Sequence, residues 1–90
     1  MWRITPGQVL RFRQFDEEFV VYNDLSGDTH LLGDSAMHLL SVLQHGPASR
    51  ADLLASLAAA LECTPDAAFD EEADALLATL AGFFLIEYVA

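Results

Sequence analysis

The spacing of apolar residues changes once along this chain, at residues 31–37, and this change constrains the fold more than any other feature. Before it, apolar residues form short β-branched and aromatic runs, such as residues 19–22, which favour strands. After it, leucines recur at intervals of three and four residues, which is typical of amphipathic helices. The chain is therefore expected to fold as an α+β domain in which the strands come first.

Three strands joined by polar turns are predicted for the N-terminal part of the chain. They cover residues 9–15, 19–22 and 29–32, and the last turn is the Asn-, Asp-, Ser- and Gly-rich segment 23–28. Tight turns join antiparallel neighbours, so the strands should form an antiparallel meander. In the first strand, Arg11 and Arg13 share one side, where they either pair with acidic neighbours or bind an anion.

Three helices are predicted after the sheet, followed by an extended segment over residues 83–86 that packs on the core. Their starts and ends carry the usual signals: a Gly-Pro pair after the first, a capping box at the second, and a Thr-Pro pair at the third. The expected bounds are Gly33 or Asp34 to Gly46, Ser49 to Leu61, and Thr64 to Gly82. Three short helices after a sheet resemble a winged helix-turn-helix.

Charge and composition limit the classes of partner. Fourteen acidic residues against four arginines give a net charge of −10, which repels phosphate backbones and anionic membranes. The sequence has neither a run of roughly 20 apolar residues, as a membrane span requires, nor the apolar core of a secretory signal. The single cysteine, Cys63, fits a reducing compartment. We therefore expect a cytoplasmic protein that binds neither nucleic acid nor membrane, and whose partner carries basic residues.

Residues suited to catalysis or metal binding are few. His38 and His45 could share a helix face with Asp34, and this is the one arrangement that could hold a metal. The Ser, Asp and His of segment 26–30 resemble a catalytic triad only in composition, because the Asp and the His would point to the same side of a strand. There is no phosphate-binding glycine loop. The sequence predicts no enzymatic activity, no cofactor and no bound metal.

The junction between the third strand and the first helix carries a family resemblance. Residues 30–36, His-Leu-Leu-Gly-Asp-Ser-Ala, resemble the Leu-Asn-x-Ser/Thr-Ala signature of PqqD-like proteins. Segments 45–54 and 72–86 are similar to the later motifs of that family, so the resemblance spans residues 8–88. Run 22–32 resembles the subgroup associated with an HPr-kinase-related protein. Gly33 stands where the family usually has Asn or Asp, and Phe84 stands where Gly is common.

The resemblance implies that residues 1–90 form a single peptide-binding domain. It would have a three-stranded antiparallel sheet followed by a winged-helix-like three-helix bundle. PqqD-like proteins are recognition elements for ribosomally made peptides that are later modified. They are non-catalytic: they bind the leader segment of a precursor peptide as an added strand and present it to a modifying enzyme. Because such proteins can exchange elements, a monomer–dimer equilibrium is also expected.

The residues expected to bind the peptide lie on the third strand and the third helix. An edge strand offers unpaired N–H and C=O groups, and apolar pockets beside it give selectivity. Ordinary core packing is the alternative for at least half of the helix leucines. The predicted peptide-binding residues are Thr29, His30, Leu31, Leu32, Phe69, Glu72, Ala73, Leu76, Leu77 and Leu80.

Two other functions fit the same sequence. An acidic winged-helix regulator acting through protein or DNA contacts would share the fold, and salt-dependent DNA binding would distinguish it. A small structural subunit would co-purify with an enzyme without requiring any peptide.

Overall fold

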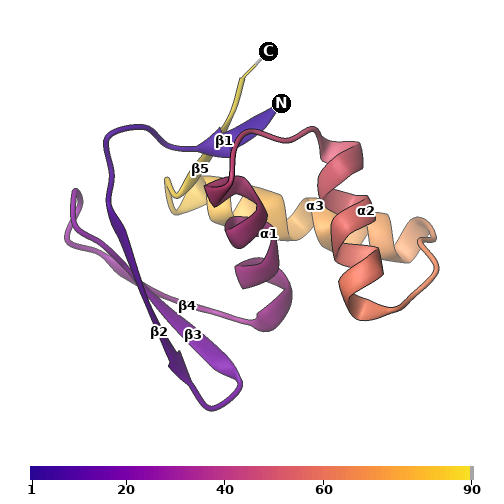
Figure 1. Ribbon diagram of the computed structural model, residues 1–90, viewed down its shortest axis with the longest axis horizontal. Coiled ribbons are helices and arrows are strands. Elements are labelled where there is room, and N and C mark those ends of the chain that lie inside the picture. The colour runs from indigo at the N-terminus through magenta and orange to yellow at the C-terminus, as the bar shows by residue number, and fades with distance from the viewer. Residues whose placement is uncertain (90) are drawn as a thin grey trace.

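A computed structural model describes residues 1–89 and confirms the predicted α+β architecture. β2 (Leu10–Phe15), β3 (Glu18–Asn23) and β4 (Thr29–Leu32) form an antiparallel sheet in the order β2-β3-β4. The helices α1 (Asp34–Gln44), α2 (Arg50–Leu61) and α3 (Ala67–Gly82) gather on one side of this sheet (Figure 1). The three strands end within one residue of their predicted bounds.

A second, two-stranded sheet joins the two ends of the chain. β1 (Trp2–Ile4) was not predicted, and it pairs antiparallel with β5 (Ile86–Tyr88). The predicted extended segment over 83–86 is shifted, because residues 83–85 form the connection from α3 and the strand begins at Ile86. The Trp2 and Tyr88 rings meet edge to face, with their centroids 5.3 Å apart. The strand pairing and this aromatic contact fasten β1 to the helical part of the molecule.

The helix starts follow the prediction in two cases out of three. Gly33 precedes α1, and its carbonyl accepts from the Met37 N–H at 3.0 Å. Ser49 caps α2, and its side chain accepts from the backbone N–H of the fourth capping-box residue at 3.1 Å. The start predicted for α3 at Thr64 is wrong, because Asp66 is the N-cap and its carboxylate accepts from the Phe69 N–H at 2.8 Å. A carboxylate both satisfies that N–H and interacts favourably with the helix dipole.

The hydrophobic core lies between the helices and the inner face of the sheet. Leucines from all three helices meet Val21 of β3 and Leu32 of β4 there. The largest fully buried side chains are Leu39, Leu40, Leu53, Leu77, Leu80, Leu85 and Val21. In the described part of the chain, no helix has the length and apolar character needed to cross a bilayer. The core uses one face of the sheet, so the other face and the sheet edges are left for contacts with partners.

Candidate functional site

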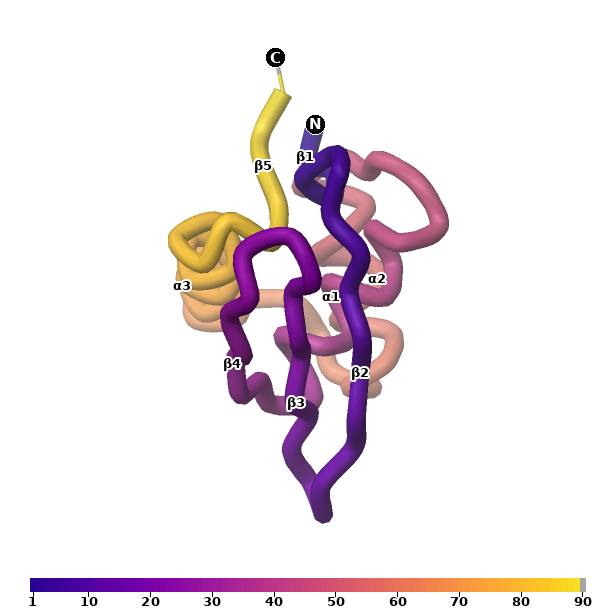
Figure 2. The backbone as a smooth tube through the Cα atoms, turned by 90° about the vertical axis from the view of Figure 1, so that its left-hand side faces the viewer, coloured from indigo at the N-terminus to yellow at the C-terminus, as the bar shows by residue number. Residues whose placement is uncertain are grey.

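β4 is an edge strand, as predicted. Within residues 1–89 it pairs only with β3. Figure 2 looks onto the sheet and shows β4 at its margin, with the end of α3 beyond it and the other helices behind. An edge strand of this kind presents a row of unpaired backbone groups to solvent. The β4 edge next to α3 is therefore a place where an extended peptide can add to the sheet.

The register of β4 identifies which backbone groups face this open edge. The Asn23 N–H donates to the Asp28 carbonyl at 2.9 Å, which extends the β3–β4 ladder by one hydrogen-bonded pair. Hydrogen-bonded and non-bonded pairs alternate along an antiparallel ladder. His30, two residues after Asp28, therefore also bonds to β3. Thr29 and Leu31 turn their N–H and C=O groups toward the open edge.

β2 gives the sheet a second open edge, which was not predicted from the sequence. The Asp24 N–H donates to the Val9 carbonyl at 3.0 Å, so these two residues form a hydrogen-bonded pair of the β2–β3 ladder. Every second residue of β2 after Val9 then also bonds to β3, and the residues between them face outward. The outward-facing groups on this edge belong to Leu10, Phe12 and Gln14. In Figure 2, β2 lies on the side of the sheet opposite α3. The two edges are alike in their backbone, and what differs is the set of side chains beside them.

The predicted strand residues alternate between the two faces of the sheet. Leu31 is 60% exposed and Thr29 is also exposed on the outer face, whereas Leu32 is 4% exposed and packs into the core. His30 is half-buried on the inner face, where its ring stacks on Phe83 with centroids 4.3 Å apart and an interplanar angle of 15°. The Nε2 atom of His30 is buried and has no hydrogen-bond partner in the described chain. This stack brings the C-terminal end of α3 against β4.

Phe83, the C-cap residue of α3, continues an apolar stripe of that helix, which we call the α3 stripe. Its members are Phe69, Leu76 and Phe83, which are seven residues apart and so share one side of the helix. Phe69 and Leu76 are half-buried, and Phe83 is 36% exposed. At 1.5 Å per residue, Leu76 lies about 10 Å from Phe83 along the helix axis and Phe69 lies about 20 Å from it. Leu76 is therefore the predicted helix residue that keeps some exposure and lies nearest to β4.

The other predicted helix residues fall into two groups. The first group, Ala73, Leu77 and Leu80, packs in the core, and each residue is 1% exposed or less. Core packing was the alternative considered from the sequence for at least half of the helix leucines. Glu72 is exposed near the distant end of the α3 stripe, one turn from Phe69. The structure thus places Thr29, His30 and Leu31 on the open β4 edge and Leu76 one step further along the α3 stripe than Phe83, which contacts His30, but it does not bring all ten residues together.

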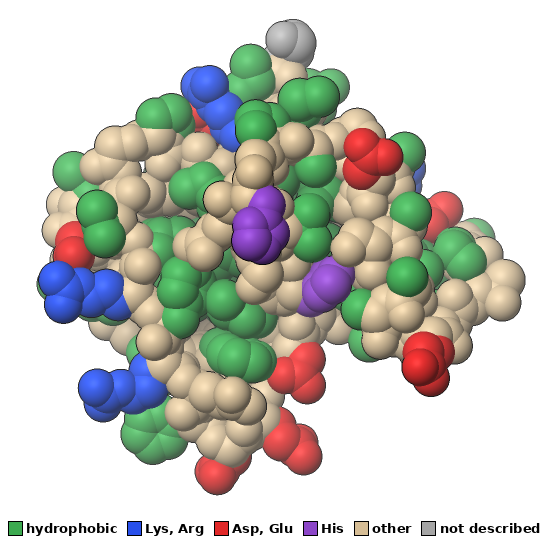
Figure 3. All heavy atoms as spheres, in the orientation of Figure 1, with side chains coloured by type: hydrophobic (Ala, Val, Ile, Leu, Met, Phe, Trp, Pro, Cys, Tyr) green, Lys and Arg blue, Asp and Glu red, His purple; other side chains and the backbone are tan. Residues whose placement is uncertain are grey.

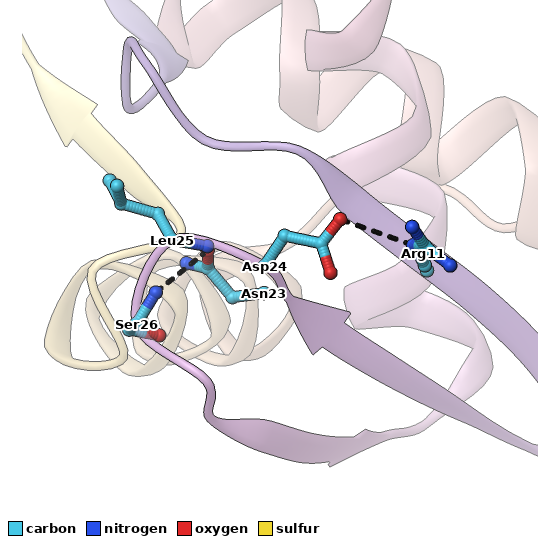
Figure 4. Close-up of polar contacts among 5 residues, drawn as sticks. All are labelled: Arg11, Asn23, Asp24, Leu25 and Ser26. Atoms are coloured by element: carbon cyan, nitrogen blue, oxygen red, sulfur yellow. Dashed lines mark hydrogen bonds and ion pairs between the residues drawn. The ribbon is translucent and has the colours of Figure 1, made fainter.

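A buried polar network fixes the turn that leads into β4 (Figure 4). Asn23 is 3% exposed, and its Oδ1 accepts from the N–H groups of Leu25 at 2.9 Å and Ser26 at 3.4 Å. Its Nδ2 donates to the Gln8 side chain, which in turn donates to the Leu85 carbonyl at 2.8 Å. The sequence indicated only that Asn23 begins a turn. The burial of Asn23 depends on Gln8 and Leu85, which are distant from it in sequence, so it could not be predicted from the local pattern.

Replacing Asn23 by Ala is expected to lower the free energy of unfolding by about 1–3 kcal/mol, because buried polar groups lose their partners. Urea denaturation followed by circular dichroism would measure the loss. Ser26→Ala is a matched control, since it removes only the exposed bond from the Asp28 N–H to Ser26 Oγ. The control should cost less than about 0.5 kcal/mol, and an equal loss in both variants would contradict the role assigned to Asn23.

Asp74, one of the acidic residues of α3, is paired with α2. Arg50 of α2 donates two hydrogen bonds to Asp74, at 2.7 and 2.9 Å, and so engages the flank of α3 away from the α3 stripe. These hydrogen bonds, together with the charge of Arg50, hold the pKa of Asp74 below its ordinary value. Both side chains are about half exposed, so the pair contributes little to stability.

The histidines do not converge on a metal site. His38 Nε2 lies 2.9 Å from Ser56 Oγ, which links α1 to α2. Across residues 1–89, no three His, Cys, Asp or Glu side chains lie close enough together to hold a metal ion. The arrangement of Asp34, His38 and His45 considered from the sequence therefore does not assemble. Cys63 is a free, exposed thiol.

Comparison with known proteins identifies the fold. No family model matches the chain, and no curated protein matches it. A solved structure described as TbiB1 in complex with the TbiA(beta) leader peptide is similar to this chain, with a TM-score of 0.72 and 98% of each chain covered. The two sequences are 21% identical. At that identity the similarity establishes a shared fold, and this fold is the one that the resemblance to PqqD-like proteins implied.

Proposed function

We propose that this chain binds the leader segment of a ribosomally made precursor peptide as an added strand on β4 and presents it to a modifying enzyme. The observation that carries the proposal is the open β4 edge beside the α3 stripe. The shared fold with a protein solved in complex with a leader peptide supports it. In this proposal residues 1–90 are a single, non-catalytic PqqD-like domain that works in the cytoplasm.

Backbone pairing would supply the affinity. Thr29 and Leu31 each offer one N–H and one C=O toward the open edge, and these groups bond to any extended peptide except at proline. They lie in the ordered β3–β4 ladder, and the Asn23 network fixes the turn before them. The edge is thus already in the conformation that the leader needs, which reduces the entropic cost of binding.

Side chains of the leader would supply the selectivity. In an added strand, alternate side chains point to the inner face of the sheet. There they would meet the exposed Phe83 and then the half-buried Leu76, the members of the α3 stripe nearest to β4. We infer that the leader carries apolar residues at alternating positions. Basic residues around them would suit a partner of net charge −10 by increasing the association rate.

DNA binding is not favoured by the arrangement of basic residues. A helix that enters the major groove usually presents Arg or Lys to the bases and phosphates. Arg50 is the only Arg or Lys in the three helices, and its guanidinium donates two hydrogen bonds to Asp74. The winged-helix-like shape therefore lacks the charge that a DNA reader requires.

The direct test uses short peptides encoded beside the gene for this chain. Synthetic N-terminal segments of these peptides would be titrated into the protein by calorimetry and into ¹⁵N-labelled protein by NMR. We expect saturable binding, with shift changes concentrated on residues 29–32 and Phe83. Absence of binding by every such segment, or shift changes confined to α2, would rule the proposal out.

The open edges also predict a monomer–dimer equilibrium, because an unpaired strand can pair with a second copy of the chain. A copy on the β4 edge would compete with the leader, so saturating leader peptide is expected to shift the equilibrium toward monomer. Light scattering across a range of concentrations, with and without leader, would measure both effects. A strictly monomeric mass at millimolar concentration would contradict the prediction.

A further inference from the structure

The three-stranded sheet has an outer face that the helices do not cover, and Figure 2 looks onto it. We define the outer sheet face by the residues whose side chains point away from the core: Arg11, Arg13, Phe15, Glu18, Val20, Tyr22, Thr29 and Leu31. Phe15 is 59% exposed, Leu31 60% and Tyr22 39%. Four of its eight side chains are apolar or aromatic, and three of these four are well exposed, a larger share than a sheet face in contact only with solvent usually carries.

The outer sheet face is also hollowed. A cavity of about 460 Å³ is lined by Arg11, Arg13 and Tyr22, together with Phe15 and Val20. A second cavity of about 740 Å³ lies toward the β2–β3 turn and shares Phe15 and Val20, but three of its six lining residues are the acids Asp16, Glu17 and Glu18. Concave, partly apolar surfaces with a few convergent polar groups are typical of binding sites. The two cavities therefore differ in charge, and only the first, with Arg11 and Arg13, suits carboxylates.

The arginines of this face are the most available positive charges in an acidic chain. Arg3 and Arg50 are each held by a carboxylate, at 2.6 and 2.7 Å. Arg11 donates to Asp24 at 3.1 Å but keeps 73% of its side chain exposed (Figure 4). Arg13 has no ion pair within residues 1–89. Figure 3 shows basic side chains projecting at the left of the molecule, with one acidic group beside the upper of them and other acidic groups at the bottom and at the right.

We propose that the outer sheet face docks an acidic, apolar segment of a partner protein. Guanidinium groups bind carboxylates through paired hydrogen bonds, so Arg11 and Arg13 would hold acidic side chains while Phe15 and Leu31 contact apolar ones. The acidic turn at residues 16–18 repels carboxylates, and this sets the direction in which the segment lies. The proposal goes beyond leader binding because it uses outer-face side chains rather than the backbone of the β4 edge.

A second copy of this chain is a poorer occupant. Two copies related by a two-fold axis would place the same surface against itself. In the arrangement that stacks the two arginine-lined cavities on each other, Arg13 of one copy would approach the arginines of the other across an apolar contact, and like charges placed together in an interface are unfavourable. The charge of the cavity lined by Arg11 and Arg13 therefore favours an acidic partner segment over a second copy of that cavity.

A pair of synthetic peptides tests the assignment. One alternates Glu with Phe and Leu, and the other has Lys in place of every Glu. Titration into ¹⁵N-labelled protein should give shift changes on the outer sheet face with the acidic peptide and none there with the basic one. Arg13→Glu should weaken binding of the acidic peptide about tenfold or more. Arg3→Glu, a charge reversal elsewhere on the chain, should leave that affinity unchanged.

Three results would overturn the proposal. Shift changes confined to residues 29–32 would mean that the acidic peptide adds to the β4 edge instead. An unchanged affinity in a folded Arg13→Glu variant would remove the role of the arginine. A dimer that Arg13→Glu dissociates would assign the face to a second copy. This proposal rests on the folded domain and not on leader binding, which is measured separately and should be unaffected by Arg13→Glu. Failure of the docking proposal can therefore be told apart from failure of the leader-binding proposal.

Discussion

Leu31→Pro is expected to weaken leader binding by roughly 10- to 100-fold while leaving the domain folded. The Leu31 N–H points to the open edge of β4, so proline removes a donor for the leader without breaking a bond to β3. Proline is tolerated on edge strands where the N–H faces solvent. A carbonyl of the bound leader would then lose its partner and would also meet the proline ring.

The second open edge supplies a matched control for this experiment. Gln14 of β2 also turns its N–H outward, so Gln14→Pro makes the same chemical change on the opposite side of the sheet. Calorimetry on both variants, each shown to be folded by circular dichroism, compares the two edges directly. If Gln14→Pro weakens binding and Leu31→Pro does not, β2 is the accepting edge. If neither variant weakens binding, the leader is not held as an added strand.

Truncating two adjacent leucines of α3 is expected to give opposite results. Leu77 is 1% exposed and packs in the core, so Leu77→Ala should lower the free energy of unfolding by about 2–5 kcal/mol. That loss is a large part of the stability of a domain of this size. Leu76 is half-buried on the α3 stripe, so Leu76→Ala should cost less stability and should weaken leader binding instead.

Urea denaturation and leader titration of both variants would separate these effects. The titration of Leu77→Ala should be done where the variant is still folded, and its affinity should then match that of the unaltered protein. A Leu76→Ala variant that is destabilised as much as Leu77→Ala, with unchanged affinity, would show that the α3 stripe is only structural.

The parts of the site that depend on local sequence patterns could be predicted, and those that depend on contacts between distant segments could not. β4 has its predicted bounds because a turn-rich segment precedes it and the switch to helical spacing ends it. Its outward-facing N–H groups required the register with β3, which no local pattern reveals. Leu76 and Leu77 are neighbours in one apolar run, and only the rotation of α3 against α1 separates a surface residue from a core residue. β1 was missed because its partner β5 lies at the other end of the chain.

Phe84 shows what the family resemblance added and where it stopped. The residue adopts a φ of 62°, in the left-handed region that favours glycine, and glycine is common at this position in the pattern that the sequence resembles. The backbone therefore keeps the turn between α3 and β5 even without glycine. The sequence could not indicate that the side chain, 76% exposed, would stand in solvent close to Phe83.

The pairing of β1 with β5 has a consequence for how this domain can be joined to other polypeptides. The Met1 ammonium donates to the Val89 carbonyl at 2.8 Å, so the two ends leave the molecule together, away from the β2–β3 turn (Figures 1 and 2). A tether at either end would start from the same point and leave β4 and the outer sheet face free. A short linker between the ends and a new opening at residues 16–17 would give a circular permutant with the same strand pairings.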